Sequence, residues 1–407
     1  MALNILEDVS LAYQPIWGSK RQLVGVRLRV RALQPATFNA PQLLSLLSGE
    51  WSADAPFLLV SFADIGSLRQ ALAVNPVDHI WLELPDMGND APSGLADAAA
   101  YAYRMGHRLV QESPLARARP LPVIGQGVHR FMLHLWPEEA ARAEQAAAQV
   151  EAGQSASSPI LREQLYRDIG TSTLAAHCLD HRSAWGLCGW PVDDVLKRYQ
   201  RHGVPVDKRT LVRVQQALMR SASMETVESL IHQDAVLTFR VLRLVNSPIF
   251  GASREVTTVR QALMLLGQMR LRDWMLELMP GASADADLLP VRLALVLRGQ
   301  LMDELMDAGF QRDLSTEIYV TGLFSHLDLL MQEPMHKALG RIPVSESIRD
   351  ALLHEAGPYA TYLELARRLE RFEEVQRLPG FCETSAFPLD HVNRSLIRTL
   401  ANWRNLL

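Results

Sequence analysis

Cysteine is scarce in this chain of 407 residues, which contains only Cys178, Cys188 and Cys382. None of them belongs to a CxxC pair or has the spacing of a zinc site. An odd number of cysteines without a disulfide framework is typical of a protein in a reducing cytosol. We therefore interpret all three as small core residues.

Targeting and membrane-spanning segments are also lacking. The N-terminus MALNILEDVS has neither the basic start nor the apolar core of a signal peptide. No stretch reaches 18 apolar residues, because even the segment 289–299 contains Arg292 and Arg298. These absences predict a cytoplasmic protein with no membrane partner.

A strong charge of one sign is missing as well, since the formal net charge is -4. Such a balance gives no overall attraction to nucleic acid. The arginines of 240–272 have few aromatic residues among them, so we interpret them as a solvated or protein-docking face rather than a nucleic-acid surface. The patterns GxSxG, GxxxxGK[ST] and GxGxxG do not occur, so the corresponding hydrolase, nucleoside-triphosphate and dinucleotide sites lack support.

The sequence does contain enough apolar residues for two cores, with 48% hydrophobic and 21% charged residues. Up to about residue 190, short apolar runs alternate with helical or polar stretches, which predicts an α/β half. From Asp193 onward, apolar residues recur at helical spacing, which predicts an all-α domain. The predicted domains are 1–192 and 193–407. Candidate strands lie at 23–30, 57–62, 79–84, 108–110 and 131–135.

The clearest helical pattern ends at Asn246. Ser247 is a plausible cap for a short turn that Pro248 begins at its first position. Thr258 and Gln261 then form a T-x-x-Q capping box for the next helix. Gly267 is predicted to stop that helix.

The run LRLVNSPIFG at 242–251 resembles the HDOD domain, a helical relative of the HD phosphohydrolases that lacks their metal ligands. Its motif residues here are Asn246, Ser247, Pro248 and Phe250. We expect them to be architectural or to form an interaction site, with Phe250 packed back on the preceding helix.

The N-terminal half contains AYQPIW at 12–17 and VGVRLRVR at 24–31. This pairing resembles the opening of EAL domains, the cyclic di-GMP phosphodiesterases, whose motif is VGVEALLR. The Glu of that motif helps to bind a divalent cation in family enzymes, and Arg27 stands in its place. At about 4 Å and an effective dielectric constant of 20, the repulsion between this charge and the cation is roughly 8 kcal/mol. We expect no metal here.

Other EAL positions are changed too. Ser61 or a neighbour replaces the Asn ligand, Gln111 and Glu112 replace the paired aspartates, and Cys188 replaces a Gln. Glu83 is the acid that persists. A two-metal hydrolysis site needs several carboxylates to bind cations and activate water. We therefore predict that the chain is not an enzyme and needs no cofactor.

The resemblance implies a TIM-type (β/α)₈ barrel followed by a helical HDOD domain. Such a barrel typically takes about 250 residues, so the shorter first domain predicts a trimmed or irregular barrel. Gln14 and Arg31 match in type two residues that hold the nucleotide in the family. Together with Glu83 they are the expected ligand-binding residues if cyclic di-GMP binds.

Two pairs of potential metal ligands, each containing a histidine, have structural interpretations that we prefer to metal binding. His326 and Asp328 are two residues apart, about 200° around a helix, so they face different ways. His177 and His181 are four apart, but we predict the segment 171–179 to be a strand that passes into a turn, and no HExxH pattern is present.

These features predict a noncatalytic regulatory protein of bacterial signal transduction, in which a degenerate EAL domain and an HDOD domain contact partner proteins. Two alternatives stay open. The first is a receptor that binds cyclic di-GMP without hydrolysing it, and the second is a residual phosphodiesterase.

Overall fold

The computed structural model describes residues 4–52, 54–88, 92–118, 130–155, 157–248, 255–307 and 311–402. The chain divides into two compact units. One unit comprises Met1–Asp194 together with Arg367–Arg404, and the other is formed by Val195–Ala366. The predicted boundary after residue 192 lies near the first division. The C-terminal segment differs from the prediction, because it joins the first unit and not the helical domain.

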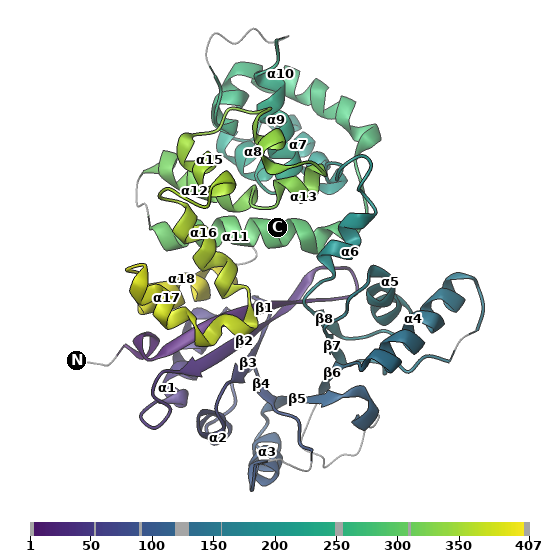
Figure 1. Cartoon of the computed structure of the whole chain (residues 1–407), viewed down its shortest axis with the longest axis vertical. Coiled ribbons are helices and arrows are strands. Elements are labelled where there is room, and N and C mark those ends of the chain that lie inside the picture. The colour runs from purple at the N-terminus through teal and green to yellow at the C-terminus, as the bar shows by residue number, and fades with distance from the viewer. Residues whose placement is uncertain are drawn as a thin grey trace. The chain divides into compact units, whose positions relative to one another are not determined.

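Within the described residues, eight strands close the first unit into a barrel in chain order (Figure 1). β1 is antiparallel to both of its neighbours, β2 and β8, whereas β2 to β8 run parallel to one another. This confirms the predicted TIM-type barrel, and the reversed β1 is its irregularity. The strands are β1 (Val9–Trp17), β2 (Leu23–Ala32), β3 (Phe57–Phe62), β4 (Ile80–Leu84), β5 (Arg108–Pro114), β6 (Arg130–His134), β7 (Leu165–Arg167) and β8 (Gly186–Cys188).

Helices connect these strands. One of them replaces the strand predicted at 171–179, and that prediction is wrong. The Thr171 hydroxyl accepts a hydrogen bond from the Leu174 amide and so caps a helix start. The helical elements are η1 (Ile5–Glu7), α1 (Ala40–Glu50), α2 (Ile65–Leu72), α3 (Leu95–Arg104), η2 (Leu115–Arg117), α4 (Pro137–Glu151), α5 (Ser172–Ala176) and η3 (His177–His181).

The barrel interior has an apolar end and a polar end. Phe57, Trp81 and Trp185 pack against the buried interior cluster near the strand starts, and the rings of Phe57 and Trp185 stack with their centroids 4.5 Å apart. Gly25 leaves space for the Phe57 ring, which a Cβ at that position would strike. The polar interior side chains therefore gather toward the carboxyl ends of the parallel strands. The interior cluster consists of Ile16, Leu59, Val110, Met132, Leu165 and Cys188.

The C-terminal segment belongs to the barrel unit because it is bonded to the first strand. The Asn393 side-chain amide donates to the Leu6 carbonyl at 2.9 Å and to the Val9 carbonyl at 2.7 Å. The Ser10 hydroxyl donates to the Val375 carbonyl at 2.7 Å. The segment consists of η6 (Phe372–Gln376), α17 (Leu378–Thr384) and α18 (Leu389–Ala401).

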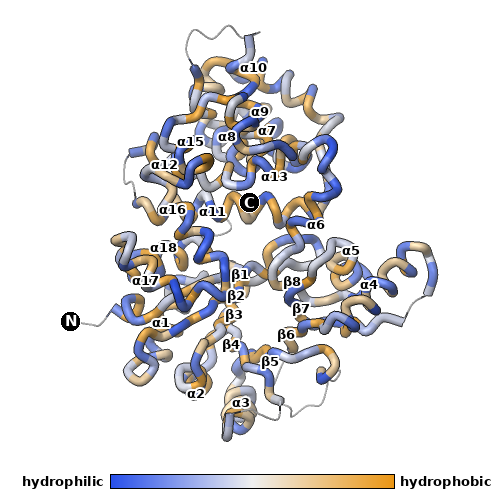
Figure 2. The backbone as a smooth tube through the Cα atoms, in the orientation of Figure 1, coloured by the Kyte–Doolittle hydropathy of each residue, from blue (hydrophilic) through white to orange (hydrophobic). Residues whose placement is uncertain are grey.

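The second unit is helical among its described residues, as predicted. In α10, Gly267 has φ 68° and breaks the helical path at the predicted stop. Orange and blue segments alternate along α10 in Figure 2. None of the described helices has the length and apolar character needed to cross a membrane. The helices are α7 (Lys208–Met219), α8 (Met224–Ile231), α9 (Ala235–Val245), α10 (Val259–Leu278), η5 (Met279–Gly281), α11 (Leu288–Met306), α12 (Arg312–Leu323), α13 (Leu327–Met331), α14 (Met335–Leu339) and α15 (Glu346–Leu353). Two further helices span the divisions, α6 (Val192–Lys197) and α16 (Ala360–Leu369).

Candidate functional site

The polar end of the barrel centres on Arg27 of β2 and Glu83 of β4. The Arg27 Nε donates to Glu83 Oε2 at 2.7 Å, and Arg27 Nη2 donates to Glu83 Oε1. The two side chains are only 5% and 4% exposed. Glu83, the acid expected to persist from the EAL pattern, is therefore held in a buried, bidentate ion pair by Arg27.

Electrostatics keep this pair charged. Burial alone would lower the pKa of the Arg27 guanidinium, but the charge and hydrogen bonds of Glu83 outweigh burial and raise that pKa. The nearby Arg29 has no such bidentate partner, and burial lowers its pKa. The Arg29 guanidinium donates to the Ser61 hydroxyl at 2.9 Å.

Gln14 of β1 is half-buried and lies beside the ion pair. Its Oε1 accepts a hydrogen bond from Cys188 Sγ at 3.0 Å, and Arg27 Nη1 lies 3.5 Å from the same oxygen. Burial raises the pKa of the Cys188 thiol to about 12. The thiol is therefore protonated at neutral pH and acts as a hydrogen-bond donor, not as a thiolate ligand.

A second acid of the barrel is also paired. Arg167 of β7 donates to Glu112 of β5 at 2.6 Å. Each of these two strand-end carboxylates, Glu83 and Glu112, thus has its own arginine. Among the described residues, no group of three His, Cys, Asp or Glu side chains has the arrangement of a metal site.

The C-terminal segment covers the arginines of β2. The Phe372 ring centroid lies 4.0 Å from the guanidinium carbon of Arg27 and 5.2 Å from that of Arg29, within cation–π range. Arg31 Nη1 donates to the Gln376 carbonyl at 3.5 Å. The structure thus brings Gln14 and Glu83 together through Arg27 and places Arg31 against the C-terminal segment.

Sequence reasoning missed Phe372, Gln376 and Arg167. Phe372 lies more than 300 residues from β2 in the chain, and no local pattern links the two. The contact of Phe372 with Arg27 and Arg29 depends on the packing of the C-terminal segment against the barrel.

The residue pairs His177/His181 and His326/Asp328 do not take part in the Arg27–Glu83 site. The rings of His177 and His181 are 6.0 Å apart, and His177 Nε2 is hydrogen-bonded to the Ser158 hydroxyl at 2.8 Å. His326 Nε2 lies 3.5 Å from Arg298 Nη1.

In the helical unit, the Asn246 side chain links the C-terminal end of α9 to Val256 by hydrogen bonds. Its side-chain nitrogen donates to the Leu242 carbonyl at 2.7 Å and to the Val256 carbonyl at 2.9 Å, and its oxygen accepts from the Val256 amide at 2.9 Å. The Ser247 hydroxyl donates back to the Leu244 carbonyl at 2.7 Å and so bonds to the last turn of α9. The turn that Ser247 was predicted to cap extends beyond the described residues, so that part stays a prediction. Pro248 is exposed. Phe250 lies outside the described residues.

Residues 204–295 match the HDOD domain. The hydrogen bonds of Asn246 with Leu242 and Val256 lie within this segment. The helical unit contains an HDOD domain. A closed barrel joined to an HDOD domain is consistent with the EAL–HDOD family, which confirms the resemblance implied by the sequence.

Two curated proteins are similar to part of the chain. The cyclic di-GMP phosphodiesterase CdgJ of Vibrio cholerae is 28% identical over 173 residues, which cover 42% of this chain and 39% of that protein. The uncharacterized protein YuxH of Bacillus subtilis is 25% identical over 154 residues, covering 36% of this chain and 37% of that protein. The matched segments thus span less than half the length of both relatives.

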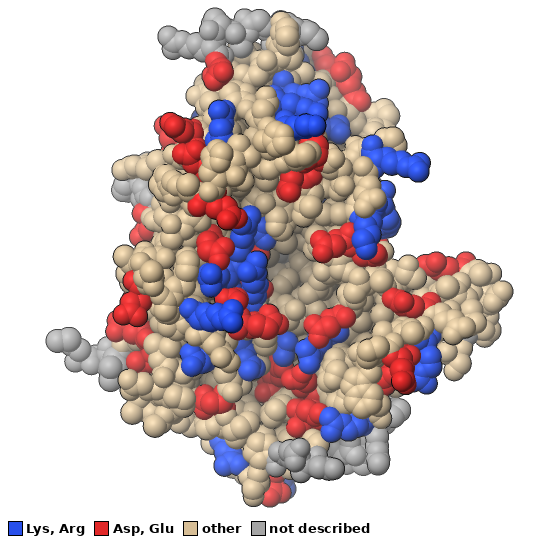
Figure 3. Space-filling model, in the orientation of Figure 1, with Lys and Arg blue, Asp and Glu red and all other residues tan. Residues whose placement is uncertain are grey.

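Among solved structures, the MmoQ response regulator of Methylococcus capsulatus is similar at 19% identity, with a TM-score of 0.40. The match covers 48% of this chain and 98% of that one. The face shown in Figure 3 has acidic and basic side chains interspersed.

Proposed function

We propose that the chain is a noncatalytic regulatory protein of cyclic di-GMP signalling that acts through contacts with partner proteins. The Arg27–Glu83 ion pair is the observation on which this proposal depends. A two-metal site requires carboxylates that are free to bind cations. Here Glu83 is neutralised by Arg27, and Glu112 is paired with Arg167.

Removing Arg27 from the pair would be costly, which supports the same conclusion. A cation that displaced the guanidinium would leave a buried positive charge without its partner, at a cost of about 3–5 kcal/mol. The similarity to the cyclic di-GMP phosphodiesterase CdgJ supports cyclic di-GMP signalling as the context of this proposal.

Exposed apolar side chains of the HDOD domain support the protein-contact part. Met264, Leu265, Met269 and Leu276 of α10 are 67%, 44%, 64% and 55% exposed. Two of these residues precede the break at Gly267 and two follow it. Exposed methionine and other large apolar side chains are typical of protein-interaction surfaces.

A hydrolysis assay tests the noncatalytic part. Purified protein is incubated with cyclic di-GMP and Mg²⁺ or Mn²⁺, linear product is followed by chromatography, and CdgJ serves as the active control. We expect no product from the wild-type chain or from Glu83→Ala. Product formation by the wild type that disappears in Glu83→Ala would refute the proposal.

A second candidate is a receptor that binds cyclic di-GMP without cleaving it, and the position of Phe372 defines how it would operate. The ring covers Arg27 and Arg29, and Arg31 is engaged by the Gln376 carbonyl. A nucleotide that used Arg31 would have to displace this segment. Calorimetric titration should then show tighter binding to Phe372→Ala and weaker binding to Arg31→Ala. Equal affinity in Arg31→Ala and the wild type would exclude this mode.

A further inference from the structure

The second half of α10, residues 268–278, carries an apolar stripe on its outer face. Met269 and Leu276 are 64% and 55% exposed, whereas Leu271 and Met275 of the same half are buried in the HDOD domain. At about 100° per residue, Met269 and Leu276 lie about 20° apart around the helix. The helical path restarts after Gly267, so this stripe belongs to the second half alone.

Two charged side chains border the stripe and are not neutralised within the chain. Arg270 and Glu277 are both exposed. They are seven residues apart, about 10 Å along one side of the helix, which is too far for an ion pair within α10. Among the described residues, neither of them has an ion-pair partner.

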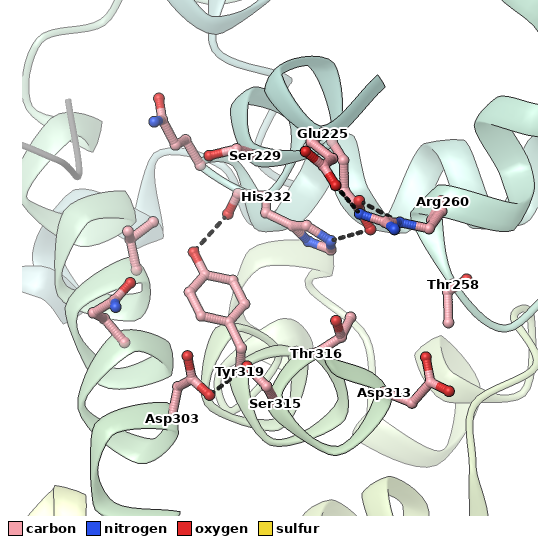
Figure 4. A pocket seen from close by; sticks show the side chains of 14 residues that line it. Glu225, Ser229, His232, Thr258, Arg260, Asp303, Asp313, Ser315, Thr316 and Tyr319 are labelled. Atoms are coloured by element: carbon pink, nitrogen blue, oxygen red, sulfur yellow. Dashed lines mark hydrogen bonds and ion pairs between the residues drawn. The ribbon is translucent and has the colours of Figure 1, made fainter. Parts of the chain in front are cut away.

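The first half of α10 differs, because its arginine is engaged within the domain. Arg260 Nε lies 3.0 Å from Glu228 Oε2, and Arg260 Nη2 lies 3.6 Å from Glu225 Oε1, both on α8. Figure 4 shows the Arg260 side chain turned toward Glu225. The charges that α10 leaves without a partner therefore lie in its second half, beside the apolar stripe.

The order of charges makes this face complementary to a second copy of itself. Two α10 helices that pack antiparallel, about a two-fold axis between residues 272 and 273, place Met269 of one copy opposite Leu276 of the other. Arg270 of one copy then lies between Asp273 and Glu277 of the other, offset from each by about 3 Å along the helix axis. Parallel packing would instead place every charge opposite its own equivalent, which is unfavourable.

We propose that the HDOD domain pairs with a second copy of this chain through the second halves of two antiparallel α10 helices. A second copy is thus the partner of the α10 surface, an assignment that rests on the protein-contact part of the proposed function. The two Asp273 side chains approach each other at the two-fold axis, where Arg272, 3.6 Å from Asp273 in the same chain, offsets their charge.

The dimer formed in this way is weak. A helix segment of about three turns buries less than the roughly 1,600 Å² of a standard protein interface. The dimer is therefore in reversible equilibrium with the monomer at micromolar concentrations.

Analytical ultracentrifugation of the full chain over a series of micromolar concentrations tests this pairing. We expect the average mass to rise with concentration from 45.5 kDa toward twice that value. Met269→Ala should weaken dimerisation by roughly tenfold or more, because each dimer loses the contact twice. Arg270→Glu and Glu277→Arg should each weaken it by roughly tenfold or more, because like charges then face each other twice.

Mixing the two charge variants distinguishes a second copy from any other occupant of this face. In a mixed dimer the introduced glutamate faces the introduced arginine, and the native Arg270 of one chain faces the native Glu277 of the other. The mixture should therefore form more dimer than either variant alone. Arg349→Glu is the matched control, because Arg349 is exposed and lies on α15, so this variant should dimerise like the wild type. Thermal melts verify that each variant is folded.

A wild-type mass that stays at 45.5 kDa at every concentration would overturn the proposal. Undiminished dimerisation of Arg270→Glu, or a mixture no more dimeric than its two components, would overturn it as well. The hydrolysis assay is separate from these measurements, because product formation would refute the noncatalytic part of the proposed function without changing the mass. Failure of either proposal can therefore be told from failure of the other.

Discussion

Arg27 and Glu83 form a bidentate ion pair inside the barrel, and both side chains are almost fully buried. The contribution of this pair to the free energy of unfolding can be measured. Arg27→Ala or Glu83→Ala should each lower the free energy of unfolding by about 3–5 kcal/mol, because each leaves one buried charge unpaired. Urea unfolding checks this prediction.

The double variant Arg27→Met/Glu83→Leu is the matched comparison. It removes both charges, so it should recover much of the lost stability. Arg377→Ala provides a surface control, since Arg377 is 78% exposed in its pair with Glu374 and its loss should be small. A double variant as unstable as either single one would contradict this account of the pair.

Phe372 should stabilise the C-terminal segment on the barrel. Phe372→Ala removes the contacts with Arg27 and Arg29, and it should cost about 1–2 kcal/mol. Phe372→Tyr keeps an aromatic face and should cost less. Limited proteolysis should cut the segment 370–377 faster in Phe372→Ala than in the other two proteins. Equal cutting rates would show that the ring does not hold the segment.

The Asn246 side chain should stabilise the HDOD domain both as a hydrogen-bond donor and as an acceptor. Asn246→Ala leaves the Val256 amide and two carbonyls without this partner, so it should cost about 1–3 kcal/mol. Asn246→Asp should be worse, because it places a carboxylate against the Leu242 and Val256 carbonyl oxygens. Thermal melts measure the loss of stability in both variants. An Asp variant as stable as wild type would contradict the stabilising role of these hydrogen bonds.

Phe250 lies outside the described residues, so its packing stays a prediction. Phe250→Ala should cost about 3–5 kcal/mol if the ring is buried. A thermal melt beside a partner-binding assay separates the two interpretations of the motif. An unchanged melting temperature with lost partner binding would mark Phe250 as part of an interaction site.

His232 should make the HDOD domain sensitive to acid. The pKa of its imidazole is about 4 in the folded protein, below the ordinary 6.5, because the ring is buried. The unfolded chain therefore takes up this proton more readily, so stability is full above about pH 6.5 and falls as the pH drops toward 4. The loss amounts to about 3 kcal/mol. His232→Gln should flatten this part of the pH profile of urea unfolding, and an unchanged profile would contradict the assignment.

Local patterns predicted much of the architecture. The strand at 57–62 has the predicted bounds, and Thr258 and Gly267 mark the start and the break of α10 as expected. The motif also drew attention to Arg27, which the structure places in a buried ion pair with Glu83. In contrast, the Thr171 cap was missed, because apolar residues at 174–179 suit a strand and a short helix equally.

The contacts that sequence could not reveal are those between distant segments. The ring of Phe372 over Arg27 and the bonds of Asn393 to Leu6 and Val9 join the two ends of the chain. Among the described residues, the ring nitrogens of the buried His232 likewise have no hydrogen-bond partner. Neither sequence periodicity nor a motif indicates that a buried side chain has no hydrogen-bond partner.

The return of the C-terminal helices to β1 also sets an order for biosynthesis. The barrel unit contains Met1–Asp194 and Arg367–Arg404, so the ribosome must translate the intervening helical unit before the last pieces of the barrel unit exist. Until then, the backbone carbonyls of Leu6 and Val9 lack the amide of Asn393. The helical unit can fold as the nascent chain emerges, whereas the barrel unit, although begun first, is completed last.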